Sequence, residues 1–148
     1  MQAEVDHVTD PVEETIWLES LPEPVAPIVY VAYADLRSPD LDDVLQRHIQ
    51  AGQVRGSRQE AWYEPTSTRA DMPRENLLLN PTWRAGLKRL IEHDLSFDLL
   101  VWPHQPGQAA DVFADVPDLP LIVEHTGMPT LDDQTAHRRV AGRTHEDS

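Results

Sequence analysis

FDLLVWPHQ (97–105) and LPLIVEHTG (119–127) are the two segments of the sequence that decide the fold. Each contains a short apolar run that is bounded by turn residues, at 97–102 in the first segment and at 121–123 in the second. Such runs are typical of strands that are buried on both faces of a parallel sheet. The intervening PGQAADVFADVPD (106–118) has apolar residues near helical spacing. We therefore predict a strand–helix–strand unit, which wraps right-handed and leaves its two strands parallel.

A histidine follows each of these apolar runs: His104 follows the first and His125 the second. Parallel strands end at the same edge of the sheet, and the carboxyl edge is where such folds place their chemistry. We expect the two imidazoles to share one site there. The alternative, which the residues alone leave equally open, is that each is a hydrogen-bonded structural histidine.

The composition limits the classes of function. A chain of 148 residues is long enough for one domain with a core. Its formal net charge of −14 argues against nucleic acid and anionic membranes as partners. There is no cysteine, which excludes disulfides, thiolate metal sites and a cysteine nucleophile. No apolar run approaches the ~18 residues of a membrane span and no signal pattern opens the chain, so we expect a cytoplasmic protein.

Strands and helices alternate along the whole chain up to about residue 129. An N-terminal helix, beginning at Pro11, is expected to carry Val12, Ile16 and Trp17 on one side. The order of elements predicts an α/β fold with about five parallel strands, either as an open doubly wound sheet or as part of a closed (β/α) barrel. The strands are expected at residues 1–5, 28–34, 53–58, 97–102 and 121–123, and the helices at 11–21, 40–51, 81–93 and 106–118.

Two segments have no regular pattern. Residues 59–80 form a long irregular stretch, which in a compact domain is usually functional or disordered. Residues 130–148 have almost no apolar periodicity, and we expect a disordered or poorly packed tail. The expected domain therefore covers residues 1–129. The sequence contains no GxGxxG motif and no phosphate loop, which weakens a nucleotide-binding interpretation.

The sequence resembles the amidohydrolase-related family of (β/α)-barrel hydrolases, and within it the sugar-lactonase and pyrone-dicarboxylate-lactonase-like branch. PHQ and EHTG are the sharpest motifs, and RGSRQ supports them. The resemblance is carried in unbroken order by QAEVD (2–6), DPVEETIWL (10–18), VAYADLRSPDL (31–41), VRGSRQ (54–59), LLLNPTWRAGLKRL (77–90), FDLLVWPHQ (97–105) and DLPLIVEHTGMP (118–129).

This resemblance implies a partial eight-stranded barrel with an active site at the carboxyl ends of the strands. It places His104 and His125 where family members hold a divalent metal, such as zinc or manganese, or where metal-free lactonases position water and substrate. Arg58 matches an arginine that binds a substrate carboxylate or carbonyl oxygen. The resemblance thus implies a metal-dependent or metal-free hydrolase acting on a small-molecule lactone.

The sequence also departs from the family pattern. The first-strand His-x-His pair and the last-strand aspartate are absent, and 148 residues fall short of the ~250 of a full barrel. Two other hypotheses therefore stand: a catalytically inactive truncated remnant, or an acidic small-molecule-binding α/β module. The chain is also expected to self-associate through exposed sheet edges. Glu124, next to His125 in an expected strand, is interpreted as structural and as pointing to the opposite face.

Overall fold

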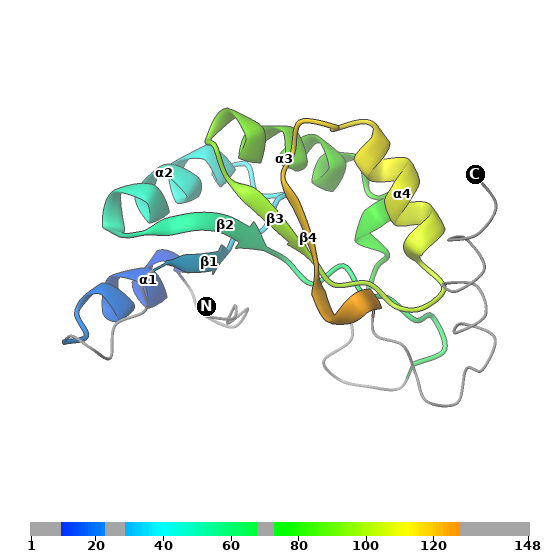
Figure 1. Ribbon diagram of the computed structural model, residues 1–148, viewed down its shortest axis with the longest axis horizontal. Coiled ribbons are helices and arrows are strands. Elements are labelled where there is room, and N and C mark those ends of the chain that lie inside the picture. The colour runs from blue at the N-terminus through cyan, green and yellow to red at the C-terminus, as the bar shows by residue number, and fades with distance from the viewer. Residues whose placement is uncertain (1–9, 23–28, 68–72, 128–148) are drawn as a thin grey trace, which may run out of the picture.

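A computed structural model describes residues 10–22, 29–67 and 73–127. These residues form one parallel sheet whose strands lie in the order β1-β2-β3-β4 (Figure 1). The strands are β1 (Tyr30–Tyr33), β2 (Val54–Arg58), β3 (Ser96–Leu99) and β4 (Leu121–Val123). The helices are α1 (Val12–Glu19), α2 (Leu41–Ala51), α3 (Pro81–Glu92) and α4 (Pro106–Ala114), with short 3-10 turns at η1 (Leu77–Leu79) and η2 (Glu124–Gly127).

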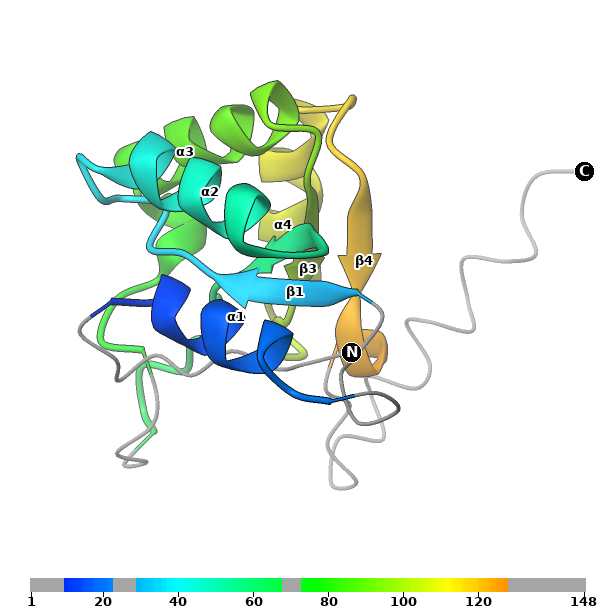
Figure 2. The same ribbon diagram turned by 90° about the vertical axis from the view of Figure 1, so that its left-hand side faces the viewer.

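Helices α2, α3 and α4 lie along one side of the sheet, and both ribbon views show this layer (Figures 1 and 2). The hydrophobic core fills the space between the helices and the sheet. Phe97 of β3 is fully buried there, with its ring edge-on to Trp83 of α3 and stacked on Phe113 of α4. These aromatic contacts join the central strand to two helices, and they add to the free energy gained by removing apolar surface from water.

Local sequence explains where α3 begins and how closely it packs. Asn80 caps the helix by accepting a hydrogen bond from the Trp83 amide, and Pro81 occupies the first turn, where no amide proton is needed. Gly86 faces the loop after β1: a Cβ atom placed there would lie 2.3 Å from the carbonyl oxygen of Leu36. Only a residue without a side chain permits this approach.

The buried face of α1 does not coincide with the side expected to carry Val12, Ile16 and Trp17. Val12, Thr15 and Leu18 are buried, whereas Ile16 and Trp17 are exposed. The cause is the spacing of three residues between the buried positions, which places polar Thr15 on the inner face. Its hydroxyl lies 2.9 Å from Nδ1 of the buried His48 on α2, so the hydrogen bond compensates the polar burial.

The α/β fold predicted from the sequence is confirmed, with four parallel strands that alternate with helices as in part of a (β/α) barrel. Each pair of neighbouring strands is parallel. The fifth expected strand, at residues 1–5, and the expected tail at 130–148 lie outside the described residues. The strand expected at 97–102 forms its ladder only from Ser96 to Leu99.

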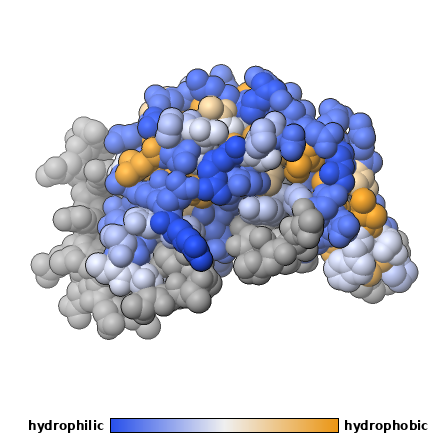
Figure 3. Space-filling view, turned by 180° about the vertical axis from the view of Figure 1, so that it is seen from behind, coloured by the Kyte–Doolittle hydropathy of each residue, from blue (hydrophilic) through white to orange (hydrophobic). Residues whose placement is uncertain are grey.

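The face of the protein that is seen from behind is mostly hydrophilic, and hydrophobic residues form small scattered groups there among polar ones (Figure 3). This agrees with the strong negative charge of the chain. Within the described ranges, no helix combines the length and apolar character that crossing a membrane requires.

Candidate functional site

A buried group of charged side chains lies across three strands where they approach the carboxyl edge. Arg58 ends β2 and is the register partner of Asp98 in β3. Its Nη2 donates to Asp98 Oδ2 at 3.1 Å and to Glu124 Oε1, just past β4, at 2.5 Å. All three side chains are largely buried. We call Arg58, Asp98 and Glu124 the arginine cluster.

The arginine cluster is not fully satisfied. Arg58 Nε and Asp98 Oδ1 are buried, and neither has a hydrogen-bond partner within the part of the chain that the structure describes. Burial raises the pKa of the Asp98 carboxyl, although the hydrogen bond from Arg58 opposes this. The nearby Glu124 raises the pKa further, because two carboxylates at short range resist being charged together. Native proteins leave few buried polar atoms unpaired, so these atoms call for an explanation.

His104 lies in the loop after β3 and its side chain is about half exposed. Its Nδ1 is 3.6 Å from Oε2 of Glu64, which belongs to the irregular stretch after β2. No motif in the sequence marks Glu64 as a candidate. Since the 59–80 stretch is far from His104 in sequence, only the fold brings this carboxylate beside the imidazole.

His125 lies in η2, directly after β4, and its side chain is largely exposed. Its Nε2 is 3.5 Å from Oε2 of Glu124, so the two neighbours lie together and do not point to opposite faces as expected. The reason is local: the chain turns into a 3-10 segment at Glu124, and strand alternation ends. His125 also has a φ of 47°, in the left-handed region that non-glycine residues rarely occupy. Such backbone conformations cost free energy and cluster at functional sites.

The loops around these histidines are held by two buried glutamine side chains. Gln105 Oε1 accepts hydrogen bonds from the amides of Tyr63 and Trp102, and its Nε2 donates to the Ala61 carbonyl oxygen. Gln59 Oε1 accepts from the Leu36 amide and from Trp83 Nε1. The glutamines of the PHQ and RGSRQ motifs therefore fix loop positions.

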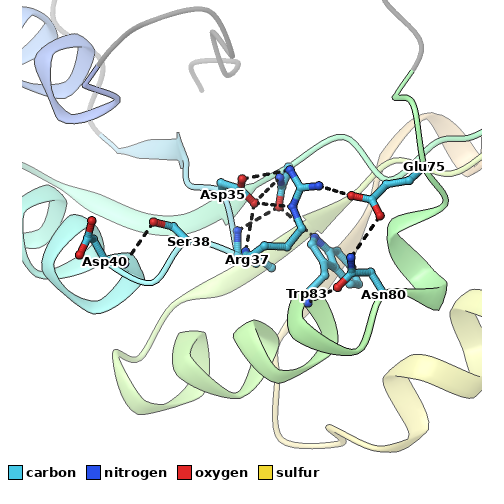
Figure 4. Close-up of polar contacts among 9 residues, drawn as sticks. Asp35, Arg37, Ser38, Asp40, Glu75, Asn80 and Trp83 are labelled. Carbon is cyan, nitrogen blue, oxygen red and sulfur yellow. Dashed lines mark hydrogen bonds and ion pairs between the residues drawn. The ribbon is translucent and has the colours of Figure 1, made fainter.

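A second charged group follows β1 (Figure 4). Arg37 lies between Asp35, to which it donates at 2.9 and 3.0 Å, and Glu75, with which it forms an ion pair. Burial raises the pKa of Asp35, but the hydrogen bonds from Arg37 and Gln59 together lower it below its ordinary value. Asp35 is thus ionised, and both carboxylates around Arg37 offset its positive charge.

Two tryptophans from adjacent loops meet near this edge. Trp62 and Trp102 have ring centroids 5.4 Å apart, and Trp62 is buried. The burial of Trp62 shows that its ring packs within the protein, while Trp102 is partly exposed.

The described residues do not form a complete metal site. Nowhere in residues 10–22, 29–67 and 73–127 do three or more His, Asp or Glu side chains gather closely enough to hold a metal ion. A catalytic metal generally takes about three protein ligands and one open position. The shared His104/His125 site and the assignment of both as metal ligands stay predictions.

The fold places the chain among parallel α/β proteins whose strands and helices alternate as in part of a (β/α) barrel. A family model described as "Amidohydrolase" matches residues 16–146. The chain belongs to the amidohydrolase family, as its sequence motifs predicted. Amidohydrolases are often metal-dependent.

A curated relative, "Uncharacterized protein y4mH" of Sinorhizobium fredii (strain NBRC 101917 / NGR234), is 34% identical over 121 residues. This alignment covers 81% of the chain and 41% of the relative. The chain thus spans less than half the length of that relative. No solved structure matches the chain. The family match continues through residues 130–146, which the sequence analysis assigned to a tail.

Proposed function

We propose that the carboxyl edge of this sheet hydrolyses a lactone or a similar cyclic ester. Membership of the amidohydrolase family supports hydrolysis as the reaction class. The observation that carries the proposal is that each candidate histidine has a glutamate beside it, His104 with Glu64 and His125 with Glu124. An imidazole next to a carboxylate is suited to accept a proton, because the carboxylate stabilises the imidazolium that forms.

The reaction then follows ordinary ester chemistry. A neutral imidazole takes a proton from water as the water oxygen attacks the lactone carbonyl carbon. The ring C–O bond of the tetrahedral intermediate breaks, and the imidazolium returns the proton to the leaving alkoxide oxygen. Of the two histidines, His125 is the better candidate base, because its glutamate is itself held in place by Arg58.

Arg58 has a different role in this proposal from the one expected. Its Nη2 already serves two carboxylates, so it acts by positioning Glu124. Direct binding of a substrate carboxylate by Arg58 stays a prediction, and it requires one of these carboxylates to give way.

The proposal is tested by assaying the full chain against a panel of uncharged and carboxylated lactones. His125→Gln is expected to lower kcat by about 100-fold, the range of a lost general base, and His104→Gln is expected to lower it by a smaller factor. His93→Gln is the matched control, because His93 precedes β3 at the opposite edge of the sheet and pairs with Asp42. Turnover that survives both histidine substitutions would overturn the proposal.

A second candidate function is lactone binding without catalysis, as in an inactive remnant or a binding module. The lengths of the two imidazole–carboxylate contacts favour it, because 3.6 Å from His104 to Glu64 and 3.5 Å from His125 to Glu124 are longer than the hydrogen bond that orients a general base. Calorimetry separates the two functions. Saturable lactone binding without product formation would identify the binding module.

A further inference from the structure

We propose that Asp98 and Glu124 set the charge specificity of this site: by occupying Arg58 they exclude anionic ligands and select an uncharged, hydroxyl-bearing lactone. This inference rests on the proposed function for its ligand class.

The arginine cluster leaves no net positive charge at the end of β2. If both carboxylates are ionised, the three side chains sum to −1. Burial raises the pKa of Asp98, and if Asp98 is neutral, Arg58 and Glu124 still sum to zero. In either state a ligand carboxylate would meet an arginine whose charge is already balanced, and it would be repelled by Glu124 at short range.

The charged group after β1 has the same composition, one arginine paired with two carboxylates. Arg37 is bracketed by Asp35 and Glu75, so these three side chains also sum to −1. Arg58, the last residue of β2, and Arg37, in the loop after the neighbouring strand β1, are thus each paired with two carboxylates. A site built to capture anions would present the guanidinium forks of these arginines unopposed.

The unpaired atoms of the arginine cluster indicate which chemistry fits. Asp98 Oδ1 is a fully buried acceptor without a partner in the described part of the chain. While Asp98 is ionised, a hydroxyl group can donate to this oxygen, whereas a second carboxylate cannot. An uncharged ligand rich in hydroxyl groups therefore suits the cluster, and a carboxylated one does not.

The test compares two probes that differ in one group: an uncharged five-membered sugar lactone, and the same lactone with its terminal hydroxymethyl oxidised to a carboxylate. Calorimetry with the full chain is expected to show at least tenfold tighter binding of the uncharged probe. Glu124→Gln keeps the shape of the side chain but removes its charge. It is expected to tighten binding of the carboxylated probe by about tenfold, and Arg58→Gln in the same chain should abolish that gain.

Asp115→Asn is the matched control, because it removes one negative charge from an exposed pair with Arg84. It should change both affinities by less than about twofold, since solvent screens distant surface charges. Three results would overturn the proposal: equal or tighter wild-type binding of the carboxylated probe, an unchanged preference in Glu124→Gln, or no wild-type binding of either probe. Binding of the uncharged probe without hydrolysis would leave this inference standing and would contradict the proposed hydrolase.

Discussion

The two outermost strands of the described sheet, β1 and β4, are apolar in the same way but are covered very differently. In β1, Tyr30 is 2% exposed and both Val31 and Ala32 are 8% exposed. In β4, Leu121, Ile122 and Val123 are 37%, 47% and 54% exposed. Figure 2 shows α1 and α2 on either side of β1, whereas β4 lies at the rim. An apolar strand at an edge is therefore stable here for two different reasons.

β1 is held by packing, and β4 is held mainly by its register with β3 and by the arginine cluster beyond it. The parallel ladder pairs Phe97, Asp98 and Leu99 with the three residues of β4. Glu124 then ties the end of β4 to Arg58 of β2. Ion pairs thus help to hold β4, where little apolar surface is buried, whereas apolar packing holds β1. Substitutions at each end of the sheet can test this difference.

The largest effect is expected from Arg58→Met. It leaves Asp98 and Glu124 buried without their cation, which typically costs about 3–5 kcal/mol. Urea denaturation followed by circular dichroism would measure the loss in the free energy of unfolding. Arg84→Met removes an exposed pair with Asp115 and should cost less than about 1 kcal/mol. Equal losses in the two variants would show that the cluster does not hold β4.

Leu45→Ala should come next. Leu45 on α2 is 1% exposed and belongs to the core beside β1, so its truncation should cost about 3 kcal/mol. The matched change at the other end of the sheet is Ile122→Ala, where the side chain is already half exposed. We expect a loss below about 1 kcal/mol there. A similar loss at both positions would mean that β4 is covered in solution.

Acidification should weaken the β1 end through His48. Burial lowers the pKa of this histidine, whose Nε2 lies 3.0 Å from the Tyr33 carbonyl oxygen. Because the folded-state pKa lies below the ordinary value of 6.5, the unfolded chain binds the proton first as the pH falls. Stability is therefore full above pH 6.5 and is lost below it, with a slope of at most about 1.4 kcal/mol per pH unit.

The contribution of His48 is isolated by comparing urea midpoints of the wild type and His48→Gln between pH 7.5 and pH 5. The variant should show the shallower dependence. Parallel curves would show that His48 is not the group that titrates.

The smallest effect on stability is expected from Ile122→Lys, below about 0.5 kcal/mol, because the side chain can reach water. Its effect on association should be larger, since a lysine blunts an exposed strand edge. Sedimentation velocity is expected to show concentration-dependent self-association of the wild type that this variant reduces. Leu79→Lys, at an exposed apolar position in η1, is the control and should leave association unchanged.

The fold could be predicted from the sequence because apolar periodicity and caps are local signals. The Asn80–Pro81 start of α3 and the apolar run of β4 could both be read directly from the residues. The face of α1 could not, because the choice between Thr15 and Ile16 depends on a hydrogen bond to His48, which lies 33 positions away.

The candidate site could be predicted from the sequence only in part. The sequence indicated His104, His125 and Arg58, but it did not show that Arg58 is shared by two carboxylates. Register between parallel strands decides that contact, and sequence spacing across a crossover does not report register. In the PHQ motif, the side chain of Gln105 fixes the positions of loops. Glu64, the carboxylate that lies beside His104, belongs to no recognisable motif.

The single amide group of Gln105 has a consequence for motion. It satisfies backbone groups from the loop after β2 and the loop after β3 at once. Neither loop can open alone without leaving a buried polar group unpaired. The two loops should therefore behave as one cooperative opening unit, in which the amide protons of Tyr63 and Trp102 exchange with solvent at matching free energies of opening. The candidate site would then become accessible through one concerted fluctuation and not through two independent ones.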